Sequence, residues 1–233
     1  MNLTKKQFFV FLHIGDDPNV DLMVRSINSR NQNAYIIQCS DNKTKKIDGA
    51  SDIFRVSADT TNLMTFRLQA FSNLKLKEPA IYLDTDMLVL KSLDTHGLIG
   101  NSEVVCCKRS FGLNDIVNTS FRGMDLSEYR NKTLGEIYPI LASFTITKSF
   151  EFWSACLKNL LELDKKFHWW YGDQEAMRNV ANSNQFAISY LPESTVACLP
   201  EFFNNNNPPM CLHFKGSQRK AWMREIFHQL KYT

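Results

Sequence analysis

AIYLDTDMLVL, residues 80–90, places two carboxylates between two short apolar runs. The four apolar residues before Asp84 are typical of a buried strand. Residues two apart in an extended chain point the same way, so Asp84 and Asp86 are expected to face one point. Carboxylates held that close repel each other unless a cation lies between them or one is protonated. Oxygen ligands favour a hard divalent ion, so the stretch predicts a Mg²⁺ or Mn²⁺ site, with a solvated surface turn as the alternative.

Strands and helices alternate on the N-terminal side of this stretch. Apolar or β-branched runs predict strands at 7–13, 34–40, 53–57 and 80–83, and helical spacing predicts helices at 19–29 and 62–76. Such alternation is typical of an α/β fold with a mainly parallel sheet and covering helices. Ligands of open α/β sheets bind at the carboxyl ends of strands, which is where the two aspartates are expected.

The C-terminal half is less regular. The polar segment 112–138 is expected to leave the sheet, and a last short strand is expected at 210–214. Helices are predicted at 149–163, with Ser149 as N-cap and Leu161 on the apolar face, at 173–181 and at 217–230. We find no internal repeat and no long linker, so the chain 1–233 is expected to form a single domain.

Composition excludes several classes of protein. Of 233 residues, 44% are hydrophobic and 22% are charged, as in globular proteins. The net charge of +3 is not a nucleic-acid-binding signature. The longest apolar run, at 8–12, is far shorter than the ~20 residues of a membrane span, and it is not typical of a signal peptide. The six cysteines show no CxxC spacing, so we expect reduced, buried thiols, a cytoplasmic location and at most peripheral membrane contact.

A single arginine interrupts the apolar side of the helix expected at 62–76. Arg67 lies among Leu63, Phe66, Ala70 and Phe71 at helical spacing. An isolated guanidinium is costly to bury, so Arg67 is expected to be paired. It could form a structural salt bridge, or it could clamp a phosphate, for which its planar fork is well suited.

Four motifs, taken in order, resemble the GT-A nucleotide-sugar glycosyltransferases, and within them glycosyltransferase family 8, the bacterial lipooligosaccharide galactosyltransferase and glycogenin group. They are FFVFLHIGD at 8–16, Arg67 upstream of YLDTDMLV at 82–89, Gly172-Asp173-Gln174, and His213-Phe214-Lys215-Gly216. The resemblance covers most of the chain and is weakest over 112–138. It implies a GT-A (Rossmann-like) single catalytic domain, with a nucleotide-binding half at about 1–100 and an acceptor half at about 101–233.

The resemblance implies a hexosyltransferase-like enzyme. It would use Mn²⁺ or Mg²⁺ to move a sugar from a nucleotide-diphosphate sugar, expected to be a UDP-sugar, to a glycan or lipid-linked acceptor. Family 8 enzymes retain anomeric configuration, and a double displacement would need a carboxylate near the anomeric carbon. The matching residue is Gln174, a poor nucleophile, so the acceptor is expected to attack on the face that the nucleotide leaves.

The resemblance also implies a role for each matched residue. Metal ligands would be Asp84, Asp86 and His213. The nucleoside pocket would contain His13, Gly15 and Asp16. The diphosphate would meet Arg67 and a basic residue, for which Lys215, Arg219 and Lys220 compete, and Thr85 and Gly216 would also be cofactor-binding residues. Asp173 would bind donor-sugar hydroxyls, and Gln174 would lie near the reacting carbon.

Two segments depart from the family pattern. Leu141-Ala142-Ser143-Phe144 stands where the family often has an Asn-Ala-Gly-like segment for the sugar, and Arg219-Lys220-Ala221-Trp222 replaces a Lys-Pro-Trp end. A non-catalytic GT-A-shaped binding protein therefore remains an alternative. A haloacid-dehalogenase-like phosphatase is a further one, although its Asp-x-Asp is usually near the N-terminus and followed by Gly-Thr rather than by Met87-Leu88.

Simpler interpretations of single residues also stay open. Asp173 could be an ordinary helix N-cap. His213 could be a core histidine, and the basic residues from Lys215 to Arg224 could form a solvated helix face. The aromatic run Trp169-Trp170-Tyr171 could stack on an acceptor sugar or plug the core.

Overall fold

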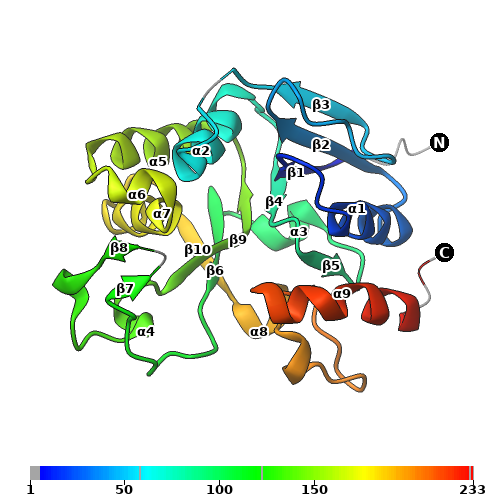
Figure 1. The fold of residues 1–233 in the computed structure, drawn as a ribbon. Helices are drawn as coiled ribbons and strands as arrows, with labels where there is room; N and C mark the ends of the chain where they lie inside the picture. Colours follow the sequence, from blue (N-terminus) through cyan, green and yellow to red (C-terminus); the bar gives the residue numbers. More distant parts are fainter. Residues whose placement is uncertain (1–5, 58, 122, 231, 233) are drawn as a thin grey trace.

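The computed structural model describes residues 6–57, 59–121, 123–230 and 232. Its centre is a seven-stranded sheet of order β10-β6-β9-β4-β1-β2-β3 (Figure 1). The strands are β1 (Gln7–Leu12), β2 (Ala34–Ser40), β3 (Asp52–Arg55), β4 (Ala80–Leu83), β6 (Val104–Lys108), β9 (Ile140–Thr147) and β10 (Ile188–Pro192). Strand β9 runs antiparallel to both of its neighbours, and the other pairings are parallel. The expected mainly parallel α/β sheet is confirmed.

Helices cover both faces of the sheet (Figure 1). One face carries α1 (Asn19–Arg30), α3 (Thr95–Ile99), α9 (Ser217–Gln229) and the two-stranded ribbon of β5 (Met87–Val89) and β11 (Cys211–His213). The other carries α2 (Leu63–Asn73), α5 (Glu151–Glu162), α6 (Lys166–Trp169) and α7 (Gly172–Asn182). Successive strand residues serve opposite faces: Phe9 and Phe11 pack in the first core and Val10 in the second.

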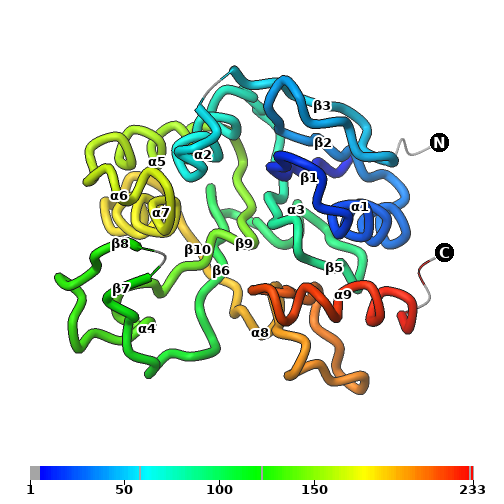
Figure 2. Tube along the Cα trace, in the orientation of Figure 1, coloured from blue at the N-terminus to red at the C-terminus, as the bar shows by residue number. Residues whose placement is uncertain are grey.

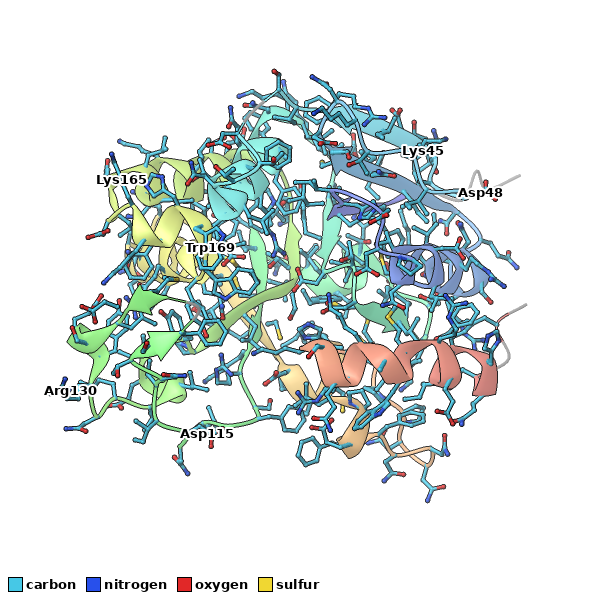
Figure 3. The ribbon with its side chains drawn as sticks, in the orientation of Figure 1. Lys45, Asp48, Asp115, Arg130, Lys165 and Trp169 are labelled. Carbon is cyan, nitrogen blue, oxygen red and sulfur yellow. The ribbon has the colours of Figure 1, made fainter. Side chains whose placement is uncertain are left out.

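The chain leaves the sheet after β6 and returns at β9, as expected for 112–138 (Figure 2). This excursion contains β7 (Ser120–Phe121), β8 (Met124–Asp125), the 3₁₀ helix η1 (Ser127–Tyr129) and α4 (Leu134–Ile137). Figure 3 shows Asp115 and Arg130 on it, on the opposite side of the view from Lys45 and Asp48 in the loop after β2. The chain after β10 forms α8 (Glu193–Val196) and the 3₁₀ helix η2 (Pro200–Phe202) before β11.

Several expectations about local structure were wrong. Helix α5 has Phe150, not Ser149, at its N-cap position, and Leu161 is 56% exposed rather than on the buried face. Strands β6, β9 and β10 were not predicted, since their sequences lack the period-two alternation of a half-buried strand. All eight residues of β9 are buried, because covering helices exclude water from both sides of the sheet.

Two expectations from composition agree with the structure. All six cysteines are free and buried, as expected for reduced thiols. None of the helices in the described part of the chain is long and apolar enough to cross a membrane.

Candidate functional site

Strand pairing brings the two aspartates and the histidine together. The backbone N–H of Asp84 donates to the carbonyl oxygen of Ser143 at 3.0 Å, continuing the pairing of β4 with β9. Asp86 immediately precedes β5, whose antiparallel partner β11 places His213 opposite Met87. The N–H of Phe214 also donates to the carbonyl oxygen of Asp86 at 2.8 Å. The register of β5 and β11 therefore fixes the imidazole beside the Asp-Thr-Asp turn.

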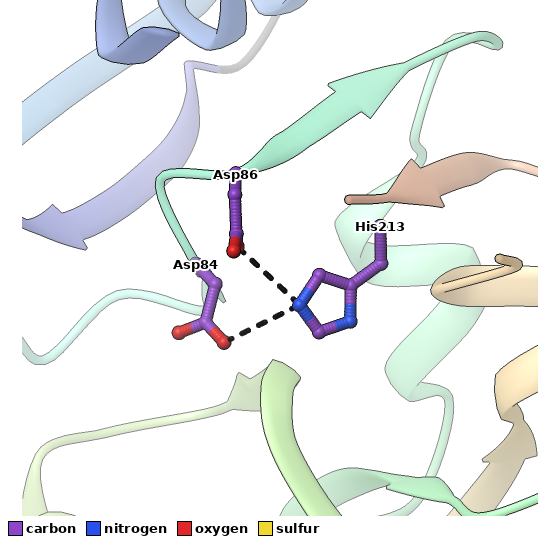
Figure 4. A group of neighbouring side chains, drawn as sticks. All are labelled: Asp84, Asp86 and His213. Carbon is purple, nitrogen blue, oxygen red and sulfur yellow. Dashed lines mark ion pairs between the residues drawn. The ribbon is translucent and has the colours of Figure 1, made fainter. Parts of the chain in front are cut away.

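The side chains of Asp84, Asp86 and His213 face one another (Figure 4). Nε2 of His213 lies 3.3 Å from Oδ1 of Asp86 and 3.9 Å from Oδ2 of Asp84. One ligand atom from each residue lies within 4.8 Å of the others. Neighbouring ligands around an octahedral cation with bonds of about 2.1 Å are about 3 Å apart. Two carboxylates and an imidazole at these separations fit Mn²⁺ or Mg²⁺.

Lys220, on the first turn of α9, completes the charge around Asp86. Its Nζ lies 3.4 Å from Oδ2 of Asp86 and 3.8 Å from Oδ2 of Asp17. Burial alone would raise the pKa of Asp86, but the neighbouring His213 and Lys220 leave that pKa well below its ordinary value. Asp86 is therefore held as a carboxylate, the form that binds a cation.

Arg67, on α2, extends its guanidinium group to Asp84. Its Nη2 lies 2.7 Å from Oδ1 of Asp84 and donates to the carbonyl oxygen of Ala142 at 2.8 Å, and its Nη1 donates to Oδ2 of Asp173 at 3.1 Å. Burial works to lower the pKa of this guanidinium, and the two carboxylates raise it above its ordinary value. The expectation that Arg67 is paired is confirmed, and its partners are site residues.

The start of α7 presents Asp173 and Gln174 to the site. Tyr171 occupies the N-cap position with φ 59°, in the left-handed region that non-glycine residues seldom adopt. Asp173 is therefore not the N-cap, although its Oδ1 accepts the N–H of Gln174 at 2.8 Å. Burial raises the pKa of Asp173, and Arg67 works to lower it. Oε1 of Gln174 is buried and has no hydrogen-bond partner among the described residues.

Two cavities are lined by residues of the Asp84–Asp86–His213 cluster, and a third lies beside the first. The first, of about 280 Å³, contains Arg67, Asp84, Thr85, Asp86 and Lys220, together with residues of β1 and α2. The second, of about 460 Å³, shares four of these and Trp170, and it adds Ser143, Tyr171, Asp173, Gln174, His213, Lys215 and Gly216. The third, of about 590 Å³, lies between the loops after β1 and β2 and contains His13, Gly15, Asp16, Asp41, Lys43 and Thr44. His13 lines the first and third cavities, so the three are neighbours.

One residue expected at the site lies apart from these cavities. Arg219 lines none of the three, and its guanidinium pairs with Glu201, where Nε lies 2.9 Å from Oε2. Its neighbour Lys220 lines the first and second cavities. Lys220 therefore faces the site, whereas Arg219, the residue before it on α9, faces Glu201 of η2.

Other lining residues carried weak signals or none. Met64 and Asp17 were not expected at the site, because an apolar helix residue and a loop aspartate are common in any fold. Ser143 was noted only as part of a departure from the family pattern. Its hydroxyl is buried at the second cavity and has no hydrogen-bond partner among the described residues.

Comparison with known proteins adds a fold assignment. No protein-family model matches the chain, and no curated protein sequence matches it either. The glycosyltransferase GlyE of Streptococcus pneumoniae TIGR4 superposes with a TM-score of 0.61 at 14% identity over 99% of this chain and 61% of that one, so this chain spans about three fifths of GlyE. An active-site mutant of LgtC gives a TM-score of 0.58 at 14% identity over 96% and 95%. The LgtC galactosyltransferase in complex with donor and acceptor sugar analogs gives a TM-score of 0.52 at 14% identity, over the same shares of each chain.

Identities this low establish the fold alone. The mixed central sheet with helices on both faces is the GT-A glycosyltransferase fold that the four motifs predicted.

Proposed function

We propose that this protein is a metal-dependent glycosyltransferase. It moves a hexose from a nucleotide-diphosphate sugar, with UDP as the nucleotide we favour, to a glycan or lipid-linked acceptor. The observation that carries the proposal is the cluster of Asp84, Asp86 and His213: both aspartates line the first and the second cavity, and His213 lines the second. A cytoplasmic location, with at most peripheral membrane contact, is kept as part of the proposal.

The three cavities match the three parts of the donor. The base and ribose would occupy the third cavity, with His13, Gly15 and Asp16. The diphosphate would occupy the first, where Arg67 and Lys220 offer charge-assisted hydrogen bonds. The sugar would occupy the second, where Ser143 and Gln174 have polar atoms without partners among the described residues. Unpartnered buried polar groups are costly, and sugar hydroxyls would satisfy them.

Asp84, Asp86 and His213 would hold Mn²⁺ or Mg²⁺. Such an ion, when bound, neutralises the charge that accumulates on the departing diphosphate. The protein's own part is to hold Asp86 ionised and to aim the imidazole nitrogen at both carboxylates. The pairing of β5 with β11 and the neighbouring Lys220 accomplish this without a ligand.

Transfer would proceed with retention of configuration. Gln174 cannot serve as a carboxylate nucleophile, so the acceptor hydroxyl attacks the anomeric carbon on the face that the diphosphate leaves. The bond from that carbon to the phosphate oxygen breaks as the new glycosidic bond forms. The hydroxyl proton passes to the departing phosphate oxygen. Asp173, fixed by Arg67, would orient the sugar through its hydroxyls.

A non-catalytic sugar-binding protein is the second candidate, and Ser143 favours it. The serine stands where the family often carries an amide, so sugar could be bound without being positioned for transfer. The GT-A fold leaves no ground for the phosphatase alternative.

Calorimetry with UDP and GDP, with Mn²⁺ and after chelation, tests the proposal. We expect binding of at least one nucleotide in Mn²⁺ and at least tenfold weaker binding without it, because the metal and the diphosphate share the first cavity. Asp86→Asn should lose the metal dependence, whereas Asp48→Asn, at an exposed residue that lines none of the three cavities, should keep it. Absence of nucleotide binding in Mn²⁺ would reject the proposal. Binding without hydrolysis or transfer across a panel of donor sugars would favour the second candidate.

A further inference from the structure

Two lysines near the start of α9 face different cavities. Lys220 lines both the first and the second cavity and lies 3.4 Å from Asp86. Lys215 lines only the second cavity, with Ser143 and Gln174. Within the described parts of the chain, Nζ of Lys215 forms no ion pair and no hydrogen bond. Lys215 therefore presents a free cation to the cavity that we assign to sugar, away from the diphosphate.

A second cation lies behind Lys215. Arg109 directly follows β6 and is only 7% exposed, and its Nε donates to the carbonyl oxygen of Tyr138 at 2.8 Å. It lies within electrostatic range of Lys215, as does the buried carboxylate of Glu193. No ion pair of Arg109 within 4 Å is formed with any described residue.

Several carboxylates act on Lys215 and Arg109 without pairing with them directly. Among the described side chains, the carboxylate of Glu193 acts on both cations, that of Asp84 acts also on Lys215, and that of Asp115 acts also on Arg109. Oε2 of Glu193 already accepts the N–H groups of Ser110 at 2.9 Å and Phe111 at 3.0 Å. Arg109 is thus a buried cation and Lys215 an exposed one, and neither forms an ion pair within 4 Å with a described carboxylate, so an anion in the second cavity would meet a positive charge that no side chain pairs directly.

The diphosphate does not need Lys215. Arg67 and Lys220 already line the first cavity. One atom each of Asp84, Asp86 and His213 could also hold a cation that binds the diphosphate. A neutral sugar would use the hydroxyl of Ser143 and the amide of Gln174, but it would give Lys215 and Arg109 no counter-charge.

We propose that the saccharide in the second cavity carries a carboxylate or phosphate group, which Lys215 binds directly and which the positive charge of Arg109 reinforces. This inference rests on the proposed function and names the substrate class of the same site. The charged group could belong to the acceptor or to the transferred sugar, as in a uronic acid. A charge-assisted hydrogen bond at this wall would separate charged from neutral substrates.

Saturation-transfer NMR with free saccharides tests the acceptor. UDP and Mg²⁺ at saturation block the first cavity, and glucose, glucuronic acid and glucose 6-phosphate are compared as ligands. We expect one charged sugar to bind about tenfold more tightly than glucose, the effect of one charge-assisted hydrogen bond. Lys215→Ala should remove this preference and Lys215→Arg should restore it. Lys158→Ala, an exposed lysine on α5, should leave the preference intact.

Calorimetry with UDP-glucuronic acid and UDP-glucose tests the donor in the same variants. If the charge belongs to the transferred sugar, Lys215→Ala weakens only UDP-glucuronic acid. The inference is overturned if wild-type protein prefers no charged ligand in either experiment, or if Lys215→Ala leaves the preference unchanged. It is also overturned if Lys215→Ala weakens UDP as strongly as the charged sugars, because Lys215 would then serve the diphosphate. Failure to bind any nucleotide rejects the proposed function, and the free saccharides alone then decide the inference.

Discussion

Nη2 of Arg67 lies 2.7 Å from Oδ1 of Asp84, while the other carboxylate oxygen of Asp84 faces His213 at 3.9 Å. One oxygen of this aspartate thus meets a guanidinium and the other meets the proposed metal position. The same guanidinium contacts the buried carboxylate of Asp173 at 3.1 Å. Arg67 therefore links the proposed metal site to the proposed sugar site, and it is the shared counter-charge of two aspartates.

Arg67→Ala should destabilise the protein by about 3–5 kcal/mol, because Asp173 would keep a buried charge without a partner. Arg67→Lys should cost less, since it keeps the charge, but a single ammonium cannot reproduce the planar fork between Asp84 and Asp173. Urea unfolding followed by circular dichroism measures both. Lys132→Ala, which removes an exposed pair with Glu136, is the control and should cost under about 1 kcal/mol. Equal effects of Arg67→Ala and the control would show that Asp173 is not held as described.

A partly buried hydrogen bond between Tyr129 and Glu175 connects the excursion after β6 to α7. The hydroxyl of Tyr129 donates to Oε1 of Glu175 at 2.7 Å, and Glu175 is 1% exposed. Arg178, one turn further along α7, pairs with the same carboxylate and donates to the carbonyl oxygen of Ile137 at 2.7 Å. Since α7 also carries Asp173 and Gln174, this pair fixes the excursion relative to the proposed sugar site.

Tyr129→Phe should lower stability by about 1–3 kcal/mol near neutral pH, because a charged acceptor loses its donor. Burial and the bond to Glu175 raise the pKa of Tyr129 to about 12 from its ordinary value of 10.0. The folded protein then holds this proton more tightly than the unfolded chain. Its contribution is fully present below pH 10 and is lost as pH rises through about 12. The stability gap between wild type and Tyr129→Phe should therefore narrow across that window in urea titrations, and a constant gap would contradict the assignment.

The sequence predicted the parallel half of the sheet better than the rest. Strands β1, β2 and β4 are short apolar runs bounded by turns and helices, so periodicity finds them. Strand β9 is equally buried but mixes Ser, Thr and Ala with larger apolar residues, and only its neighbours β4 and β6 make it a strand. Leu161 was misplaced because its helix turns one face to α2 and α7 and leaves that residue in water.

The sequence predicted many residues of the candidate site, but it did not predict how the tertiary structure brings most of them together. Asp84 and Asp86 are two residues apart, so strand geometry alone predicted that they converge. His213 lies more than a hundred residues away, and the resemblance rather than spacing suggested it. The partners of Arg67 and the separation of Arg219 from Lys220 depend on how α2, α7 and α9 pack, which no local pattern encodes.

Gly172→Ala should be strongly destabilising. A Cβ on Gly172 would lie 2.0 Å from the carbonyl oxygen of Phe167 and 2.4 Å from Cδ1 of Leu160, so α6 and α7 would have to separate. Such overpacking costs about 1–3 kcal/mol or more, and displacing the first turn of α7 would move Asp173 and Gln174. Gly100→Ala is the comparison, because its Cβ meets no atom within 4 Å and only its φ of 50° opposes the change. A thermal scan showing Gly172→Ala no less stable than Gly100→Ala would contradict the tight contact.

Lys220 and Arg219 should separate phosphate binding from structure. Lys220→Ala removes the cation that lies 3.4 Å from Asp86 and lines the first cavity, so UDP affinity in Mn²⁺ should fall about tenfold. Arg219→Ala breaks a pair with Glu201 whose side chains are each about one third exposed, so it should cost under about 1 kcal/mol of stability and leave UDP affinity within about twofold. Calorimetry and urea unfolding on both variants give the four values. If Arg219→Ala instead weakened UDP as much as Lys220→Ala, Arg219 would have to leave Glu201 when nucleotide binds, and the start of α9 would have to rotate so that both side chains reach the diphosphate.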